Sequence, residues 1–126
     1  MREGTEATES NRNVVDRFSI VHAAVGAVLE ASGVPAWLAI GSHIAFEAVE
    51  NSLKDAASEL WPDARPDAMA NHLGDVASFT AGYYSSRSLR KTTAGQATLA
   101  GLAGLAGMIW MYSLTNKHTW RAKPRT

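Results

Sequence analysis

The sequence has no cysteine, no excess of either charge and no alternating pattern of apolar and polar residues. Without cysteine, disulfides, thiolate metal ligands and cysteine nucleophiles are excluded. Twelve Lys and Arg balance twelve Asp and Glu, so we predict no nucleic-acid partner. Because strand patterns are missing and Ala and Gly are abundant, the 126 residues are predicted to form one all-α domain.

Charge is also missing from one long stretch of the chain. The segment Thr92 to Asn116 has no charged residue over 25 positions, more than the roughly 20 residues that a helix needs to cross a bilayer. Trp110 and Tyr112 stand near its end, as aromatic residues do at the lipid–water boundary, and basic residues follow from Lys117. These features favour a membrane-spanning helix. The alternative is a soluble helical bundle that binds a partner through this segment.

Four helices are predicted, separated by residues that interrupt helices. Gly33 and Pro35 separate the first two, and the loop WPDARPD separates the second from the third, with Asp67 as the N-cap of the third helix. The polar turn SSRSLRKTT precedes the fourth. The predicted helices span about 16–32, 35–55, 69–86 and 94–114. They form a single membrane domain at 16–116, between a polar, flexible N-terminal tail at 1–15 and a basic C-terminal tail at 117–126.

The distribution of Lys and Arg predicts how these helices cross the membrane. With four crossings, the N-terminus, the loop between the second and third helices, and the C-terminus share one side, which carries nine of the twelve basic residues. The positive-inside rule then places both termini in the cytoplasm. The predicted fold is a four-helix polytopic integral membrane bundle in the cell inner membrane, with the lipid bilayer as its partner.

Small residues recur four positions apart on the fourth helix, in the pairs Ala97/Gly101, Ala100/Gly104 and Ala103/Gly107. Such pairs let helix backbones approach closely in lipid. We favour a close contact within the bundle over a contact with another membrane protein subunit. The second interpretation supports a different function, an accessory or structural subunit of a larger membrane complex, in which the polar residues serve helix packing.

Polar side chains share one face on each of the first three helices, whereas the fourth helix has no such face. On the second helix, His43, Glu47, Glu50 and Asn51 lie within about 100° of one another. The three faces are expected to meet, with the fourth helix outside. The predicted polar cluster consists of His22, Glu30, His43, Glu47, Glu50, Asn51 and Asp75. His72 and His118, near the predicted helix ends, are interpreted as surface residues.

Carboxylates inside a membrane are costly unless they are paired, protonated or bound to a metal ion. We predict that Glu47 and Glu50 bind a divalent metal ion or hold a proton, that His22 and Asp75 complete the site, and that Asn51 orients a carboxylate. Histidine with carboxylates suits Zn, Fe or Mn, while carboxylate and amide oxygens alone suit Mg or Ca. The alternatives are a structural polar core and, in a soluble bundle, a solvated face.

No motif decides whether the protein is an enzyme. The sequence contains neither a Gly-rich phosphate loop nor a Gly-x-Ser-x-Gly elbow. The His-xxx-Glu-xx-Glu spacing also differs from the His-Glu-xx-His and Glu-xx-His metal motifs.

Three motifs carry a resemblance to a known group of proteins. Asp16, His22 and Gly26 give D-x5-H-x3-G, the segment FEAVENS gives aromatic-E-x2-E-N-S, and 67–75 gives D-x3-N-x2-G-D. In this order they resemble small bacterial inner-membrane proteins related to the VanZ-like group. The resemblance covers roughly residues 16–82. It implies a polytopic membrane protein in which His22, Glu47, Glu50, Asn51 and Asp75 act together, and it brings no reaction with it.

Overall fold

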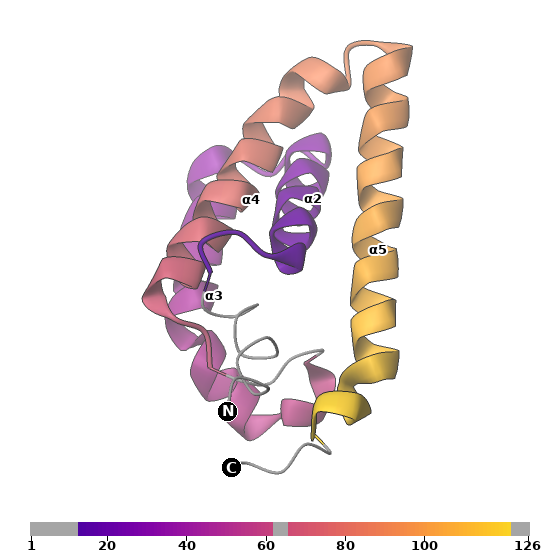
Figure 1. Cartoon of the computed structure of the whole chain (residues 1–126). Coiled ribbons are helices and arrows are strands. Elements are labelled where there is room, and N and C mark those ends of the chain that lie inside the picture. The colour runs from indigo at the N-terminus through magenta and orange to yellow at the C-terminus, as the bar shows by residue number, and fades with distance from the viewer. Residues whose placement is uncertain (1–12, 62–65, 122–126) are drawn as a thin grey trace.

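The computed structural model describes residues 13–61 and 66–121, with side chains as far as residue 115. This part of the chain is all-helical, which confirms the predicted class. Its elements are α2 (Arg17–Ala31), α3 (Ala36–Ala56), the short 3₁₀ helix η1 (Ser58–Leu60), α4 (Met69–Leu89) and α5 (Thr93–Arg121). Successive long helices run in opposite directions, and α5 lies on the outside of the bundle, against α2 and α4 (Figure 1).

The ends of α2 and the beginning of α3 follow from local chemistry. Asp16 caps α2, because its carboxylate accepts a hydrogen bond from the amide of Phe18 at 2.8 Å while the Ser19 hydroxyl accepts one from the amide of Asp16 at 3.0 Å. After α2, Gly33 adopts a φ of 84°, a left-handed conformation that favours glycine. Pro35 directly precedes the first residue of α3, where a proline is well tolerated.

The beginning of α4 differs from the prediction. Its N-cap is Ala68, which has no side-chain hydrogen bond to the helix. The carboxylate of Asp67, the predicted cap, instead pairs with the ammonium group of Lys54 at 2.8 Å. A buried ion pair has taken the place of a helix cap. The prediction was wrong because the sequence around Asp67 does not show that Lys54 will lie beside it.

Two glycines allow α2 and α4 to pack with their backbones in contact. A Cβ added at Gly26 would lie 2.1 Å from the carbonyl oxygen of Phe79, and one added at Gly82 would lie 1.9 Å from that of Ala23. Neither position can therefore hold a larger residue without moving a helix. This close approach brings the polar face of α2 within reach of that of α4.

The small residues of α5 do not make the contact that was favoured from the sequence. A Cβ added at Gly101, Gly104 or Gly107 would meet no atom within 4 Å. All three glycines are exposed, and so are Ala97, Ala100 and Ala103. The interpretation as a contact within the bundle was wrong, because α5 turns other residues, among them Ala106 and Ser113, toward its neighbours.

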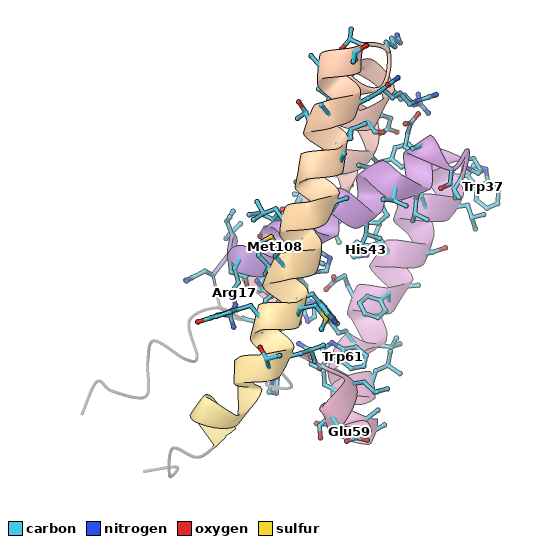
Figure 2. All side chains as sticks on the ribbon, turned by 90° about the vertical axis from the view of Figure 1, so that its right-hand side faces the viewer. Arg17, Trp37, His43, Glu59, Trp61 and Met108 are labelled. Carbon is cyan, nitrogen blue, oxygen red and sulfur yellow. The ribbon has the colours of Figure 1, made fainter. Side chains whose placement is uncertain are left out.

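The described side chains are distributed inside out compared with a soluble protein. Buried polar or charged residues number ten, against six buried hydrophobic ones, of which only Phe79 and Tyr83 are large. Large apolar side chains instead lie on the surface, including Trp37 at 77% exposure and Met108 at 70% (Figure 2). Soluble proteins bury large apolar residues and seldom bury charged ones. Exposed apolar surface of this extent is typical of proteins that bind a partner or a membrane.

Of the described helices, α5 alone contains a segment long and apolar enough to cross a membrane, Thr93–Thr115. Few residues of its most apolar stretch are buried against the rest of the chain. The length and composition of α5 therefore support the predicted membrane-spanning helix at Thr92 to Asn116. The four-crossing arrangement goes beyond this finding.

Candidate metal-binding site

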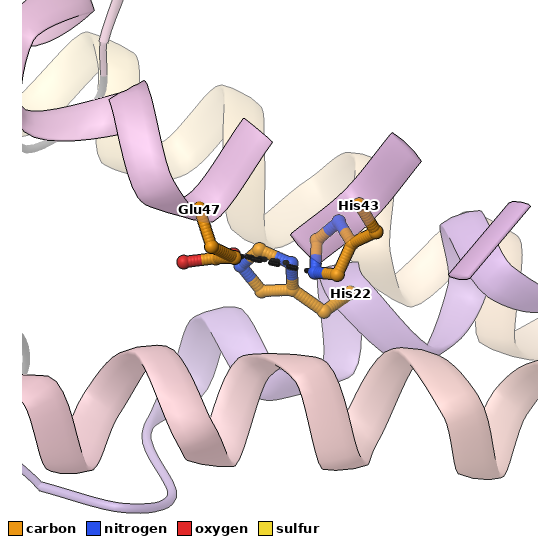
Figure 3. Close-up of side chains that lie close together, drawn as sticks. All are labelled: His22, His43 and Glu47. Atoms are coloured by element: carbon orange, nitrogen blue, oxygen red, sulfur yellow. Dashed lines mark ion pairs between the residues drawn. The ribbon is translucent and has the colours of Figure 1, made fainter. Parts of the chain in front are cut away.

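The polar faces of α2, α3 and α4 meet inside the bundle, as the sequence predicted. Glu47 of α3 lies at the centre of this region. Its Oε1 is 3.2 Å from Nε2 of His43 and 3.8 Å from Nδ1 of His22, and its Oε2 is 2.5 Å from Nδ1 of His72. Figure 3 shows the ion pairs that link His22, His43 and Glu47, which we call the two-histidine group.

The donor atoms of the two-histidine group have separations that suit one metal ion. Ligand atoms held tetrahedrally at about 2.1 Å from a metal lie roughly 3.4 Å apart. The 3.2 and 3.8 Å separations to Glu47 Oε1 bracket this value. Among the described residues, His43 Nε2 and Glu47 Oε1 have no hydrogen-bond partner, although both are buried. Buried polar atoms without a partner are uncommon, and a cation would satisfy both.

Asp75 of α4 acts on this group through His22. The Nε2 atom of His22 lies 3.2 Å from Asp75 Oδ2. When Nε2 carries the proton, it can donate a hydrogen bond to Asp75. The lone pair of Nδ1 then lies on the side of Glu47. A carboxylate that holds the far nitrogen of a histidine ligand in this way is a recurrent feature of metal sites, where it fixes the ring and its tautomer.

Stacking fixes the ring of His43. It lies parallel to the ring of Phe79, with the centroids 4.2 Å apart and an interplanar angle of 6°. Phe79 is only 1% exposed, so the histidine rests on a rigid part of the core. Tyr83, one turn later on α4, donates a hydrogen bond to the carbonyl of Val34 at 2.5 Å and ties the start of α3 to this core.

A second set of groups shares Glu47 and lies closer to the end of α3. It contains Glu47, Glu50, Asp67 and His72, and we call it the acidic group. Lys54 and Trp61 already supply this group with a cation and a hydrogen-bond donor, although Glu50 Oε2 has no hydrogen-bond partner among the described residues. Besides the Lys54–Asp67 pair, Lys54 Nζ lies 3.6 Å from Glu50 Oε1, and the indole of Trp61 donates to the same oxygen at 3.3 Å. The two-histidine group is therefore the better candidate for a metal ion.

Asn51 positions the chain before α4. Its side-chain carbonyl accepts a hydrogen bond from the amide of Asp67 at 2.9 Å, and its amide group donates to the carbonyl of Asp67 at 3.3 Å. This double contact places the Asp67 carboxylate beside Lys54. Asn51 was predicted to orient a carboxylate; in the structure it contacts the backbone of Asp67 and, at 3.5 Å, the ring of His72.

Asp16 and Asn71 close the site at the beginning of α2. Asn71 donates hydrogen bonds to Asp16 Oδ2 at 3.1 Å and to the carbonyl of Asn13 at 2.8 Å, which ties residues before α2 to α4. Burial, and then the negative charge of Asp75, raise the pKa of Asp16, while the hydrogen bonds from the Phe18 amide and from Asn71 act in the opposite direction. Negative charge therefore accumulates at this end of the site.

Glu30 was predicted to belong to the cluster, but its interactions are elsewhere. Arg90 donates to both of its oxygens at 3.1 Å, and the Nε of Arg87 lies 3.7 Å from Oε1. Glu30 belongs to neither the two-histidine group nor the acidic group. Its role in the structure is an ion pair that fastens the end of α2 to the end of α4.

Two residues of the site were not anticipated. His72, interpreted from the sequence as a surface residue, contacts Glu47, and that interpretation was wrong because the loop before α4 folds back onto α3. Lys54, only 3% exposed, stands seven residues after Glu47 and four after Glu50, so helical spacing alone would have placed it on their face. His118 lies outside the described side chains. Of the four predicted metal ligands, His22 and Glu47 belong to the two-histidine group, Glu50 to the acidic group, and Asp75 contacts His22.

Comparisons of the chain with protein-family models, with curated proteins and with solved structures find no match.

Proposed function

We propose that this is an integral membrane protein that binds one divalent transition-metal ion through His22, His43 and Glu47. The observation that carries the proposal is a buried pair of atoms, His43 Nε2 and Glu47 Oε1, which lie 3.2 Å apart and have no hydrogen bond among the described residues, with His22 Nδ1 close enough to complete a three-ligand set. Two imidazoles and one carboxylate suit Zn, Fe or Mn, whereas Mg and Ca prefer oxygen ligands alone.

Three protein ligands leave coordination positions open. Sites with two histidines and one carboxylate hold catalytic zinc or non-haem iron in many proteins, because water or a substrate occupies the remaining positions. A metal in such a site lowers the pKa of its water or polarises a bound oxygen. The proposed metal site therefore has the ligand set of a reactive metal centre. The ligand set does not define the reaction.

The distribution of apolar surface supports the membrane part of the proposal. Besides α5, the helices α2, α3 and α4 expose large aliphatic side chains, among them Val28, Ile44 and Leu73. Lipid would cover these side chains, and buried ion pairs would keep the charged groups of α2–α4 away from it. In the full form of the proposal, all four helices are embedded and both termini are cytoplasmic, as the Lys and Arg distribution predicts.

The first experiment determines the metal content and the location of the protein. The expressed chain is fractionated with an alkaline carbonate wash, purified in detergent and assayed by inductively coupled plasma mass spectrometry. We expect retention in the pellet and about one transition-metal ion per chain. Release as a soluble species that is monodisperse on size exclusion would refute the membrane part, and absence of bound metal after addition of Zn²⁺, Fe²⁺ and Mn²⁺ would refute the metal part.

A matched pair of variants tests the assignment of ligands. Glu47 and Glu30 are each 6% exposed, but only Glu47 belongs to the two-histidine group. Glu47→Gln should weaken metal binding by about a hundredfold or more, since even outer-shell changes cost roughly 10- to 100-fold. Glu30→Gln should leave it unchanged. Equal loss in both variants would point to general unfolding rather than to loss of a ligand.

A second candidate function has its own observation. The exposed glycines of α5 form an open strip on which another helix could pack closely, as in a subunit of a larger membrane complex. Purification in a mild detergent tests it. A partner recovered at fixed stoichiometry, and lost from Gly104→Leu, would support it, while a monomeric chain with a tightly bound metal would favour the first function alone.

A further inference from the structure

A cavity of about 330 Å³ lies beside the two-histidine group. Side chains of all four long helices line it, together with Trp61 and Asp67 from the segments between α3 and α4, so it is formed by the bundle and not by a single loop. Its volume is at the lower end of the range for small-molecule sites. His22 and His43 line it, whereas Glu47 does not. A metal ion held by the three residues would thus have the cavity on its imidazole side.

The walls of the cavity are apolar and partly aromatic. Phe18 and Trp110 pair edge-to-face with centroids 6.5 Å apart, which joins α2 to α5, and Phe46 stacks on Trp61 at 6.4 Å. Val21 and Val25 of α2 add aliphatic surface. These walls offer few hydrogen-bond partners for water or for a sugar. Seven polar residues also line the cavity: His22, His43, Glu50, Lys54, Asp67, Asn71 and Asp75.

Apolar side chains and two potential metal ligands in one cavity suit a molecule that has an apolar part and a metal-binding group. We propose that it binds an amphiphile, a single aliphatic chain with an anionic oxygen head group, whose chain lies against the apolar walls and whose head group coordinates the metal ion. The inference rests on the proposed metal site. A divalent ion with one ligating carboxylate keeps one positive charge, so an anionic oxygen donor is the favoured ligand for its open position. A membrane protein also meets molecules of this kind directly in the bilayer.

Cobalt-substituted protein gives a test in which metal binding and ligand binding are read separately. Co²⁺ in a site with two histidines and one carboxylate gives visible absorption bands, and a new ligand on the metal shifts them. The probes are alkyl hydroxamates of increasing chain length, from acetohydroxamate to octanohydroxamate, at a constant detergent concentration. We expect every probe to shift the bands, and affinity to rise by roughly threefold for each methylene that enters the cavity.

Two valine variants separate the cavity from the surrounding detergent. Val25 lines the cavity and Val49 does not, while their exposures are similar at 46% and 49%. Val25→Trp should reduce the affinity for octanohydroxamate to about that for acetohydroxamate and leave the cobalt bands unchanged. Val49→Trp should retain the chain-length dependence, and its intact bands would show that an added indole is tolerated.

The outcomes distinguish the two proposals. If the chain gives no cobalt bands, the proposed metal site is wrong and the amphiphile site falls with it. If the bands form but affinity in the unmodified protein is independent of chain length, the amphiphile site is wrong and the metal site stands. If affinity depends equally on chain length in both valine variants, the dependence arises from the detergent, and the amphiphile site is also wrong.

Discussion

Glu30 and Glu47 are buried to the same extent, each 6% exposed. Glu30 lies on α2 and Glu47 on α3. Glu30 is held by the guanidinium of Arg90 through two hydrogen bonds of 3.1 Å. Glu47 is surrounded by three histidines, and its Oε1 has no hydrogen-bond partner in the described part of the chain. The comparison separates a carboxylate paired with an arginine, which is always charged, from one whose neighbours are histidines, which are charged only when protonated.

The largest expected effect concerns the stabilisation of the fold by metal. Zn²⁺ at about a hundred times its Kd should raise the free energy of unfolding by about 2.7 kcal/mol, and EDTA should remove this gain. Glu47→Gln should lose the gain and Glu30→Gln should keep it. Thermal unfolding followed by circular dichroism in detergent, with and without EDTA, measures it. A gain that persists in Glu47→Gln would mean that zinc binds elsewhere.

The next effect tests the contact between Asp75 and His22. Asp75→Asn keeps the shape but removes the charge that fixes His22, so metal affinity should fall about tenfold, or 1.4 kcal/mol. Competition with a chromophoric chelator gives the affinity. Asp67→Asn, on the other side of Glu47, is the matched control and should change it less. If both changes have equal effects, the metal would lie in the acidic group.

Glu30 should show the opposite behaviour, in which stability changes and metal affinity does not. Glu30→Gln should lower the free energy of unfolding by about 1 kcal/mol, because it weakens a pair whose Arg90 side chain is half-exposed and partly screened. High salt should reduce the difference from the unmodified protein. An unchanged unfolding temperature in EDTA would show that this ion pair does not stabilise the fold.

The smallest effect concerns Asp16, a carboxylate whose pKa is raised by burial and by the negative charge of Asp75. Because its pKa is raised in the folded protein, folding favours its protonated form, and this contribution is complete below the unfolded pKa of 3.8. It disappears as pH rises through the folded pKa. Asp16→Asn, an equally good N-cap, should therefore be as stable as the unmodified protein near pH 3.5 and slightly more stable, by a few tenths of a kcal/mol, at pH 7. Unfolding curves at both pH values measure the difference. A variant that is less stable at pH 7 would refute the prediction.

Several features of the fold could be predicted because they depend on neighbouring residues. Gly33 and Pro35 end one helix and begin the next through their own backbone preferences. The polar faces of α2, α3 and α4 follow from helical spacing, and these faces do meet at His22, Glu47 and Asp75. Helical spacing alone was sufficient here because any residue pattern with this period places its members on one face.

The composition of the site was only partly predictable. His72 stands one position after Asn71, about 100° away around α4 from the predicted polar face, and it reaches Glu47 only because the preceding loop folds back onto α3. The glycines of α5 have the spacing of a packing motif but face outward, while Gly26 and Gly82 form the close contact. Spacing defines a face of a helix and leaves open which neighbour covers it.

The helical class, the beginnings and ends of the first helices, the uncharged segment Thr92 to Asn116 and the positions of Glu30 and Glu47 on polar helix faces all follow from local sequence. Which of the two glutamates pairs with an arginine depends on how the helices pack. Arg90 is sixty residues away from Glu30 in the chain and reaches it because α4 packs parallel to α2 through Gly26 and Gly82, which brings the ends of the two helices together. The charge of a buried carboxylate is balanced by groups that are close in space, and helical periodicity carries no information about those that come from another helix.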